Sequence, residues 1–69
     1  MNDLGFSYTG WCACATRAEK WVHPSGLYVK RWANLNWKLY DKAGRLLRYG
    51  NAQSNMEAEI YEYMTANGL

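Results

Sequence analysis

The segment Asn36–Gly50 constrains the fold most, because it joins two apolar stretches through a strong turn sequence. In the turn Asp41-Lys42-Ala43-Gly44, Asp can accept hydrogen bonds from backbone groups further on, and Gly adopts a positive φ without steric cost. A three-residue loop, here residues 42–44, that ends in a left-handed Gly is a common hairpin connection. The segment therefore predicts a β-hairpin with strands at about 35–41 and 45–49.

Counting outward from this loop gives a predicted register for the hairpin. One face then holds the pairs Asp41–Arg45, Leu39–Leu47 and Trp37–Tyr49, and the other holds Tyr40–Leu46 and Lys38–Arg48. The opposite-charge pair and the two apolar pairs of the first face each contribute about 0.2–1 kcal/mol, whereas like charges placed opposite each other destabilise. We therefore expect the first face in the core and the second exposed to solvent or to an anionic partner. A shift of one residue would exchange the two faces.

The last segment, about 54–67, has the pattern of an amphipathic helix. Ser54 and Glu57 fit a capping box, in which each side chain bonds a free backbone N–H of the first turn. At helical spacing, Met56, Ile60, Tyr63 and Met64 share one face. Gly68 can end the helix in the left-handed conformation. We expect the apolar face to cover one side of the sheet at Leu35, Trp37, Leu39, Leu47 and Tyr49.

The remaining strands are expected at about 11–16 and 27–33, after a loose lead-in over residues 1–10. The sequence His23-Pro24-Ser25-Gly26 is a clear turn, and residues 34–36 form a further tight turn. Within 27–33, Leu27 and Val29 alternate with Tyr28, Lys30 and Trp32, and Arg31 falls on the apolar side. The predicted fold class is thus α+β. It is an antiparallel meander of three or four strands with one C-terminal helix packed on one face.

A chain of 69 residues is expected to form one small domain, residues 1–69. Four Trp, six Tyr and one Phe supply the large side chains that so small a core needs. Residues 17–48 hold all eight basic residues and only two acidic ones, a net charge of +6, whereas residues 51–69 hold three Glu and no basic residue, a net charge of −3. The charge is therefore unevenly distributed along the chain.

No membrane partner and a cytoplasmic location are expected. No stretch approaches the roughly 20 apolar residues of a membrane span, and the first ten residues lack the pattern of a secretion signal. Because the chain starts with Met and its last segment closes a helix, we expect a complete small gene product.

The side of the sheet away from the helix is the candidate binding site. The residues expected there combine aromatic rings with basic groups: Tyr28, Lys30, Trp32, Lys38, Tyr40 and Arg48. Trp, Tyr and Arg dominate the energetics of protein interfaces. Lysines interleaved with rings also suit nucleic acid, because cations meet phosphates and rings stack on bases. Two alternatives remain open, namely burial of this face by the N-terminal segment and a homodimer interface.

Catalysis and metal binding have weaker support. Cys12 or Cys14 with His23 would form a nucleophile–base pair, but nothing marks a third orienting group. The same three residues supply at most three of the four ligands that structural zinc requires. We expect two reduced, buried thiols, no cofactor and no enzymatic activity. A Cys/His metal-binding protein is the weakest alternative.

The segments HPSGLYVKRW, GRLLRYG and SNMEAEIYEY, within residues 21–63, resemble the AP2-type and integrase-arm DNA-binding domains. That resemblance implies three strands, an amphipathic helix and DNA contacts through the sheet. The chain departs from the pattern by the extra segment Asn34–Tyr40 and by Ala52, where an aromatic residue is usual. A short meander with one helix also resembles small phage and plasmid accessory proteins, including anti-CRISPR proteins, that dock on a host defence protein.

Three hypotheses follow. The first is a non-catalytic protein-binding module, an anti-CRISPR-like phage or mobile-element inhibitor whose partner is a host protein. The second is a nucleic-acid-binding module that uses the same sheet face. The third is the small Cys/His metal protein.

Overall fold

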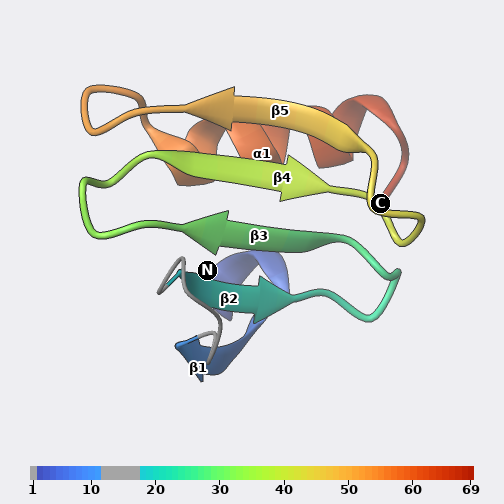
Figure 1. Ribbon diagram of the computed structural model, residues 1–69. Helices are drawn as coiled ribbons and strands as arrows, with labels where there is room; N and C mark the ends of the chain where they lie inside the picture. The colour runs from blue at the N-terminus through green and yellow to red at the C-terminus, as the bar shows by residue number, and fades with distance from the viewer. Residues whose placement is uncertain (1, 12–17) are drawn as a thin grey trace.

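The computed structural model describes residues 2–11 and 18–69. Its strands form a five-stranded antiparallel sheet in the order of the chain, so the α+β class is confirmed with one strand more than the three or four predicted. Figure 1 shows the elements: η1 (Asn2–Leu4), β1 (Ser7–Trp11), β2 (Glu19–Val22), β3 (Tyr28–Arg31), β4 (Trp37–Tyr40), β5 (Leu46–Gly50) and α1 (Met56–Ala66).

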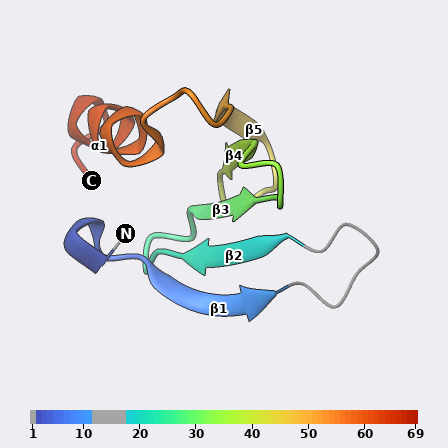
Figure 2. The ribbon, with the colours of Figure 1, turned by 90° about the vertical axis from the view of Figure 1, so that its left-hand side faces the viewer.

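The molecule has two layers. The helix α1 and the 3-10 helix η1 lie on the same side of the sheet (Figure 2). The opposite side carries no covering element from the described part of the chain. We call this side the open face; it is the side turned toward the viewer in Figure 1.

The turns between strands β2 to β5 form as their sequences predict. The β2–β3 turn has Gly26 at φ 99° and a hydrogen bond of 2.8 Å from His23 N–H to the Leu27 carbonyl. In the β3–β4 turn, the Asn36 N–H donates to the Asn34 side-chain oxygen at 3.1 Å, and Leu35 adopts φ 67°.

The β4–β5 turn is centred on Asp41, with Gly44 at φ 85°. The Asp41 carboxylate accepts hydrogen bonds from the N–H groups of Ala43 and Arg45, both at 2.9 Å. These bonds favour the ionised form, and the Arg45 bond contributes most, so the pKa of Asp41 lies below its ordinary value.

The predicted β4–β5 register is confirmed at Tyr40–Leu46 and is wrong beyond it. A β-bulge follows that pair, so that Leu39 pairs with Arg48, Lys38 with Tyr49, and Trp37 with Gly50. A bulge places two residues opposite one, and every later residue of the bulged strand changes face. The predicted pairs Leu39–Leu47, Trp37–Tyr49 and Lys38–Arg48 therefore do not form. A second bulge interrupts β1 between Tyr8 and Gly10.

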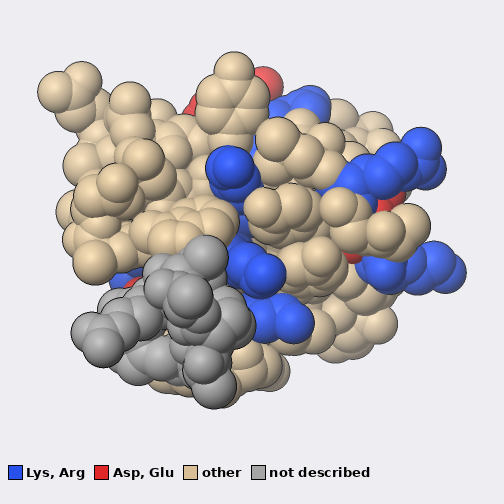
Figure 3. All heavy atoms as spheres, in the orientation of Figure 1, with Lys and Arg blue, Asp and Glu red and all other residues tan. Residues whose placement is uncertain are grey.

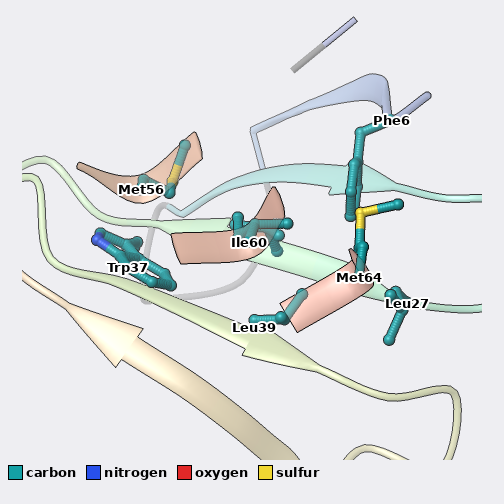
Figure 4. Packing of buried hydrophobic residues seen from close by; sticks show 8 residues of the cluster. Phe6, Leu27, Trp37, Leu39, Met56, Ile60 and Met64 are labelled. Carbon is teal, nitrogen blue, oxygen red and sulfur yellow. The ribbon is translucent and has the colours of Figure 1, made fainter. Parts of the chain in front are cut away.

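The core lies between the sheet and α1. Met56, Ile60 and Met64 of the helix are directed at the strand residues, with Trp37 at one end of the cluster and Phe6 at the other (Figure 4). The buried members are Phe6, Leu27, Val29, Trp37, Leu39, Met56, Ile60 and Met64, and Leu47 and Tyr63 pack against them while partly exposed. The predicted helix face is confirmed.

Two residues expected beneath the helix are not there. Leu35 is 47% exposed in its turn, and Tyr49 is 72% exposed because the bulge carries it to the open face. Gly50 takes the position opposite Trp37, where a Cβ would lie 2.6 Å from the indole nitrogen. Arg31 does lie on the helix side, as predicted, and there it pairs with Glu19 at 2.9 Å.

The N-terminal segment differs most from expectation. The predicted lead-in contains η1 and the strand β1, and Phe6 between them is 2% exposed in the core. Of the strand predicted at 11–16, Trp11 is the last residue of β1, and residues 12–16 lie outside the described residues. The predicted strands at 27–33 and 35–41 are shorter in the structure, at Tyr28–Arg31 and Trp37–Tyr40.

The N-cap of the helix lies one residue later in the chain than predicted. The N-cap is Asn55, whose side-chain oxygen accepts from Ala58 N–H at 3.1 Å, while the Ser54 hydroxyl accepts from Asn51 N–H at 3.3 Å. The predicted ending at Gly68 is confirmed by its φ of 70° and by a 2.9 Å hydrogen bond from Leu69 N–H to the Met64 carbonyl.

Candidate binding site on the open face

The sheet register determines which side chains reach the open face. Directly paired residues share a face, and successive residues of a strand alternate between faces. Because Val29, Trp37 and Leu39 point toward α1, their neighbours along β3 and β4 point the other way. The open-face residues of the central strands are Lys20, Val22, Tyr28, Lys30, Lys38 and Tyr40.

Three lysines occupy facing positions on three neighbouring strands. Lys20 of β2 pairs with Lys30 of β3, and Lys30 pairs with Lys38 of β4. We call these residues the lysine row. Neighbouring strands lie about 4.8 Å apart, so the backbone positions of the row cross the sheet at about that spacing. On β5 the next position is Tyr49.

No acidic residue of the described chain accompanies the lysine row on the strands. Glu19 is on the helix side of β2, and the other acidic residues are in η1, in the β4–β5 turn and on α1. Figure 3 shows basic side chains in a column across the middle of the open face and others toward its upper and right-hand margins, with only small patches of acidic atoms near these margins. The face is therefore cationic although the whole chain carries only +2.

Aromatic rings lie on both sides of the lysine row. Tyr28 and Tyr40 stack with their ring centroids 5.0 Å apart. The Lys20 ammonium lies 4.8 Å from the Tyr28 ring centre, and the Lys30 ammonium lies 6.0 Å from that of Tyr40. Exposed contacts of this kind contribute about 0.5–1 kcal/mol each, so the rings offset part of the repulsion between the lysines.

A hollow of about 290 Å³ opens beside the row, at the β3–β4 turn. We call it the Trp32 pocket; its lining residues are Trp32, Asn34, Asn36 and Lys38. The Lys38 ammonium lies 5.7 Å from the Trp32 ring centre. The Asn34 side-chain oxygen is occupied by Asn36 N–H, whereas the Asn36 side-chain amide makes no hydrogen bond with the described residues.

Five of the six predicted site residues come together. Tyr28, Lys30, Lys38 and Tyr40 lie on the open face, and Trp32 adjoins it. Arg48 does not join them, because the bulge turns it to the helix side, where its guanidinium lies 5.0 Å from the Tyr63 ring of α1.

Sequence reasoning missed Lys20 and Tyr49 as members of the open face. The signal for Lys20 is the alternation of Trp21 with Lys20 and Val22, which is typical of a half-buried strand. Tyr49 carried no such signal, because its face depends on the bulge.

Of the three residues predicted as catalytic or metal-binding candidates, only His23 lies in the part of the chain that the structure describes. No group of three or more His, Cys, Asp or Glu side chains gathers among the described residues, and Cys12 and Cys14 lie outside them. His23 Nδ1 accepts a hydrogen bond from Ser25 N–H at 3.0 Å and lies 2.7 Å from the Ser25 hydroxyl. Its ring contacts Phe6, so His23 holds its own turn and the start of β1 together.

None of the described helices is both long and apolar enough to cross a membrane. Comparison of the chain with models of protein families, with curated proteins and with solved structures gave no match.

Proposed function

We propose that this chain is a non-catalytic binding protein that docks an anionic macromolecule on its open face. The observation that carries the proposal is the lysine row: three like charges in facing register positions, with no carboxylate beside them on the described strands. Like charges directly opposite each other destabilise a sheet. A partner that brings negative charge to this face relieves the repulsion and gains the attraction of all three ammonium groups.

The aromatic residues make the same face suitable for tight contact. Tyr28, Tyr40 and Trp32 are half-buried, with ring positions already set by stacking and by the lysines. Side chains that are ordered before binding lose little entropy in the complex. The rings therefore add contact area to the electrostatic attraction.

A nucleic acid is one anionic macromolecule that fits this face, and an acidic surface of a protein is the second candidate partner. Tyr49 and Leu46 of β5 are 72% and 49% exposed on the open face, and tyrosine is enriched among the hot spots of protein interfaces. This is the surface that an inhibitor of a host defence protein would use. The phage-inhibitor role remains a prediction.

The test is retention on immobilised heparin, a polyanion, of two triple variants with equal net charge. The first variant replaces the lysine row (Lys20→Gln, Lys30→Gln, Lys38→Gln). The control removes three positive charges elsewhere (Lys42→Gln, Arg45→Gln, Arg48→Gln), in the β4–β5 turn and on the helix side. We expect the first variant to elute at much lower salt than the parent and the control to elute close to the parent.

Circular dichroism and urea denaturation establish that both variants are folded. Equal loss of retention in the two variants would mean that net charge alone attracts the polyanion. A parent chain that heparin does not retain would also contradict the proposal.

A further inference from the structure

The Trp32 pocket and the lysine row lie side by side on the open face. Trp32 directly follows β3, two residues after Lys30, and Asn36 directly precedes β4, two residues before Lys38. A 2.9 Å hydrogen bond from Trp32 N–H to the Asn36 carbonyl continues the antiparallel pairing of the two strands to these residues. Residues two apart on a strand share a face and are about 6.6 Å apart. The row therefore runs between the pocket on one side and the Tyr28–Tyr40 stack on the other.

We propose that the Trp32 pocket holds one unpaired base of a single-stranded nucleic acid whose phosphates follow the lysine row. This inference rests on the proposed function and identifies the anionic macromolecule. Single-stranded nucleic acid combines a regular line of negative charge with flat rings beside it. Proteins bind it by the matching combination, a basic track with aromatic side chains on which bases stack.

The pocket has the chemistry that a base requires. Trp32 supplies an aromatic wall. The Asn36 amide, which makes no hydrogen bond with the described residues, supplies one donor and one acceptor, the pair with which Asn recognises a base edge. The volume of about 290 Å³ equals that of about ten liquid water molecules, which suits one planar base. A duplex cannot use this wall, because the faces of its bases are covered by their neighbours.

An acidic protein fits the lysine row but makes less use of the pocket. Carboxylates pair with ammonium groups, yet they bring no ring to stack on Trp32 and need no amide donor–acceptor pair. The pocket is thus the feature that separates the two classes of partner, and the experiment is built on it.

The experiment measures the affinity of the full chain for four labelled probes by fluorescence anisotropy at low and moderate salt. The first is a mixed-sequence DNA strand of about 12 nucleotides, within the span that single-strand-binding folds cover. The second is an abasic strand of equal length and charge, the third is the matching duplex, and the fourth is polyglutamate. We expect the strand with bases to bind roughly 5- to 150-fold more tightly than the abasic strand, the usual effect of stacking one base on a ring.

Variants identify which residues cause the tighter binding of the strand with bases. Trp32→Ala is expected to abolish it while leaving the affinity for the abasic strand within about twofold, and Trp32→Phe is expected to keep most of it. Asn36→Ala should change which base is preferred. The matched control is Tyr61→Ala, which removes a ring that is 59% exposed on α1. If Trp32→Ala is unfolded, the base pocket is still tested by comparing the affinities of the parent chain and of Trp32→Phe for the strand with bases and for the abasic strand.

Every other outcome refutes the base pocket, the nucleic-acid inference or the proposed function. Equal affinity of the parent for the strand with bases and the abasic strand, or tighter binding of the duplex, refutes the base pocket and leaves the proposed function standing. Tightest binding of polyglutamate refutes the nucleic-acid inference in favour of an acidic protein partner. Failure to bind any of the four probes refutes the proposed function as well.

Discussion

Removing the central charge of the lysine row should make the protein more stable. Lys30 faces a like charge on both sides, Lys20 and Lys38. In water, two unit charges about 6 Å apart repel by about 0.7 kcal/mol, within the range of about 0.2–1 kcal/mol for facing pairs in sheets. Replacing Lys30 by Gln removes two such terms and loses the 6.0 Å contact with the Tyr40 ring, valued at about 0.5 kcal/mol.

The expected net gain for Lys30→Gln is therefore about 0.9 kcal/mol, or roughly 4–7 °C in Tm for a domain of this size. Urea denaturation at low salt and at 1 M NaCl measures it. The gain should nearly vanish at 1 M, where the screening length is about 3 Å. The same variant should bind heparin more weakly, so stability and binding change in opposite directions.

Two results would refute this reasoning. One is a Lys30→Gln variant less stable than the parent at low salt, which would show that the lysine stem or its ring contact outweighs the repulsion. The other is a gain of the same size at high salt, which would show a cause other than charge. Lys42→Gln, in the exposed β4–β5 turn, is the control and should change stability little.

Three further variants test the fold. Gly50→Ala places a Cβ 2.6 Å from the Trp37 ring, so we expect a loss of about 1–3 kcal/mol in urea denaturation, and an unchanged midpoint would contradict the β5 register. Asn55→Ala should lower the free energy of unfolding by about 1 kcal/mol, because it removes the helix cap, and Ser54→Ala should lower it clearly less. A larger loss for Ser54→Ala than for Asn55→Ala would show that Ser54 is the N-cap, as the sequence predicted. Because the pKa of Asp41 is lowered in the folded chain, the ionised carboxylate stabilises the fold fully above the ordinary value of 3.8, and this stabilisation is lost as pH falls through the lowered pKa. In denaturation curves at pH 2–6, Asp41→Asn should therefore lack this acid-dependent loss of stability.

The features that the sequence predicted correctly are those fixed by local chemistry. Gly26 and Gly44 provide the positive φ that their turns need, and Asp41 bonds its own turn. The helix face of Met56, Ile60 and Met64 follows from period alone. Such features need no knowledge of distant segments, so a single sequence suffices to find them.

The errors arose where tertiary packing decides. Nothing in the sequence Leu46-Leu47-Arg48 indicates which residue lacks a partner in β4. Leu47 is the bulged residue because that placement packs it against the core and puts Gly50 beside Trp37. Strand β1 pairs with β2 over a separation of 15 residues at Ser7–Val22, beyond the reach of local pattern. The same two causes explain the site, since Arg48 was misplaced by the bulge and Lys20 depended on the pairing of β2.

The two bulges have a consequence for how copies of this chain meet. They fall at β1 and β5, the outer strands of the sheet, which have no neighbouring strand on one side within residues 2–11 and 18–69. An uninterrupted outer strand is a template for joining further chains into fibrils. Here the bulges interrupt both outer strands, so they hinder the addition of a further strand at either edge of the sheet. Copies of this chain would therefore associate through the faces of the sheet rather than through its edges.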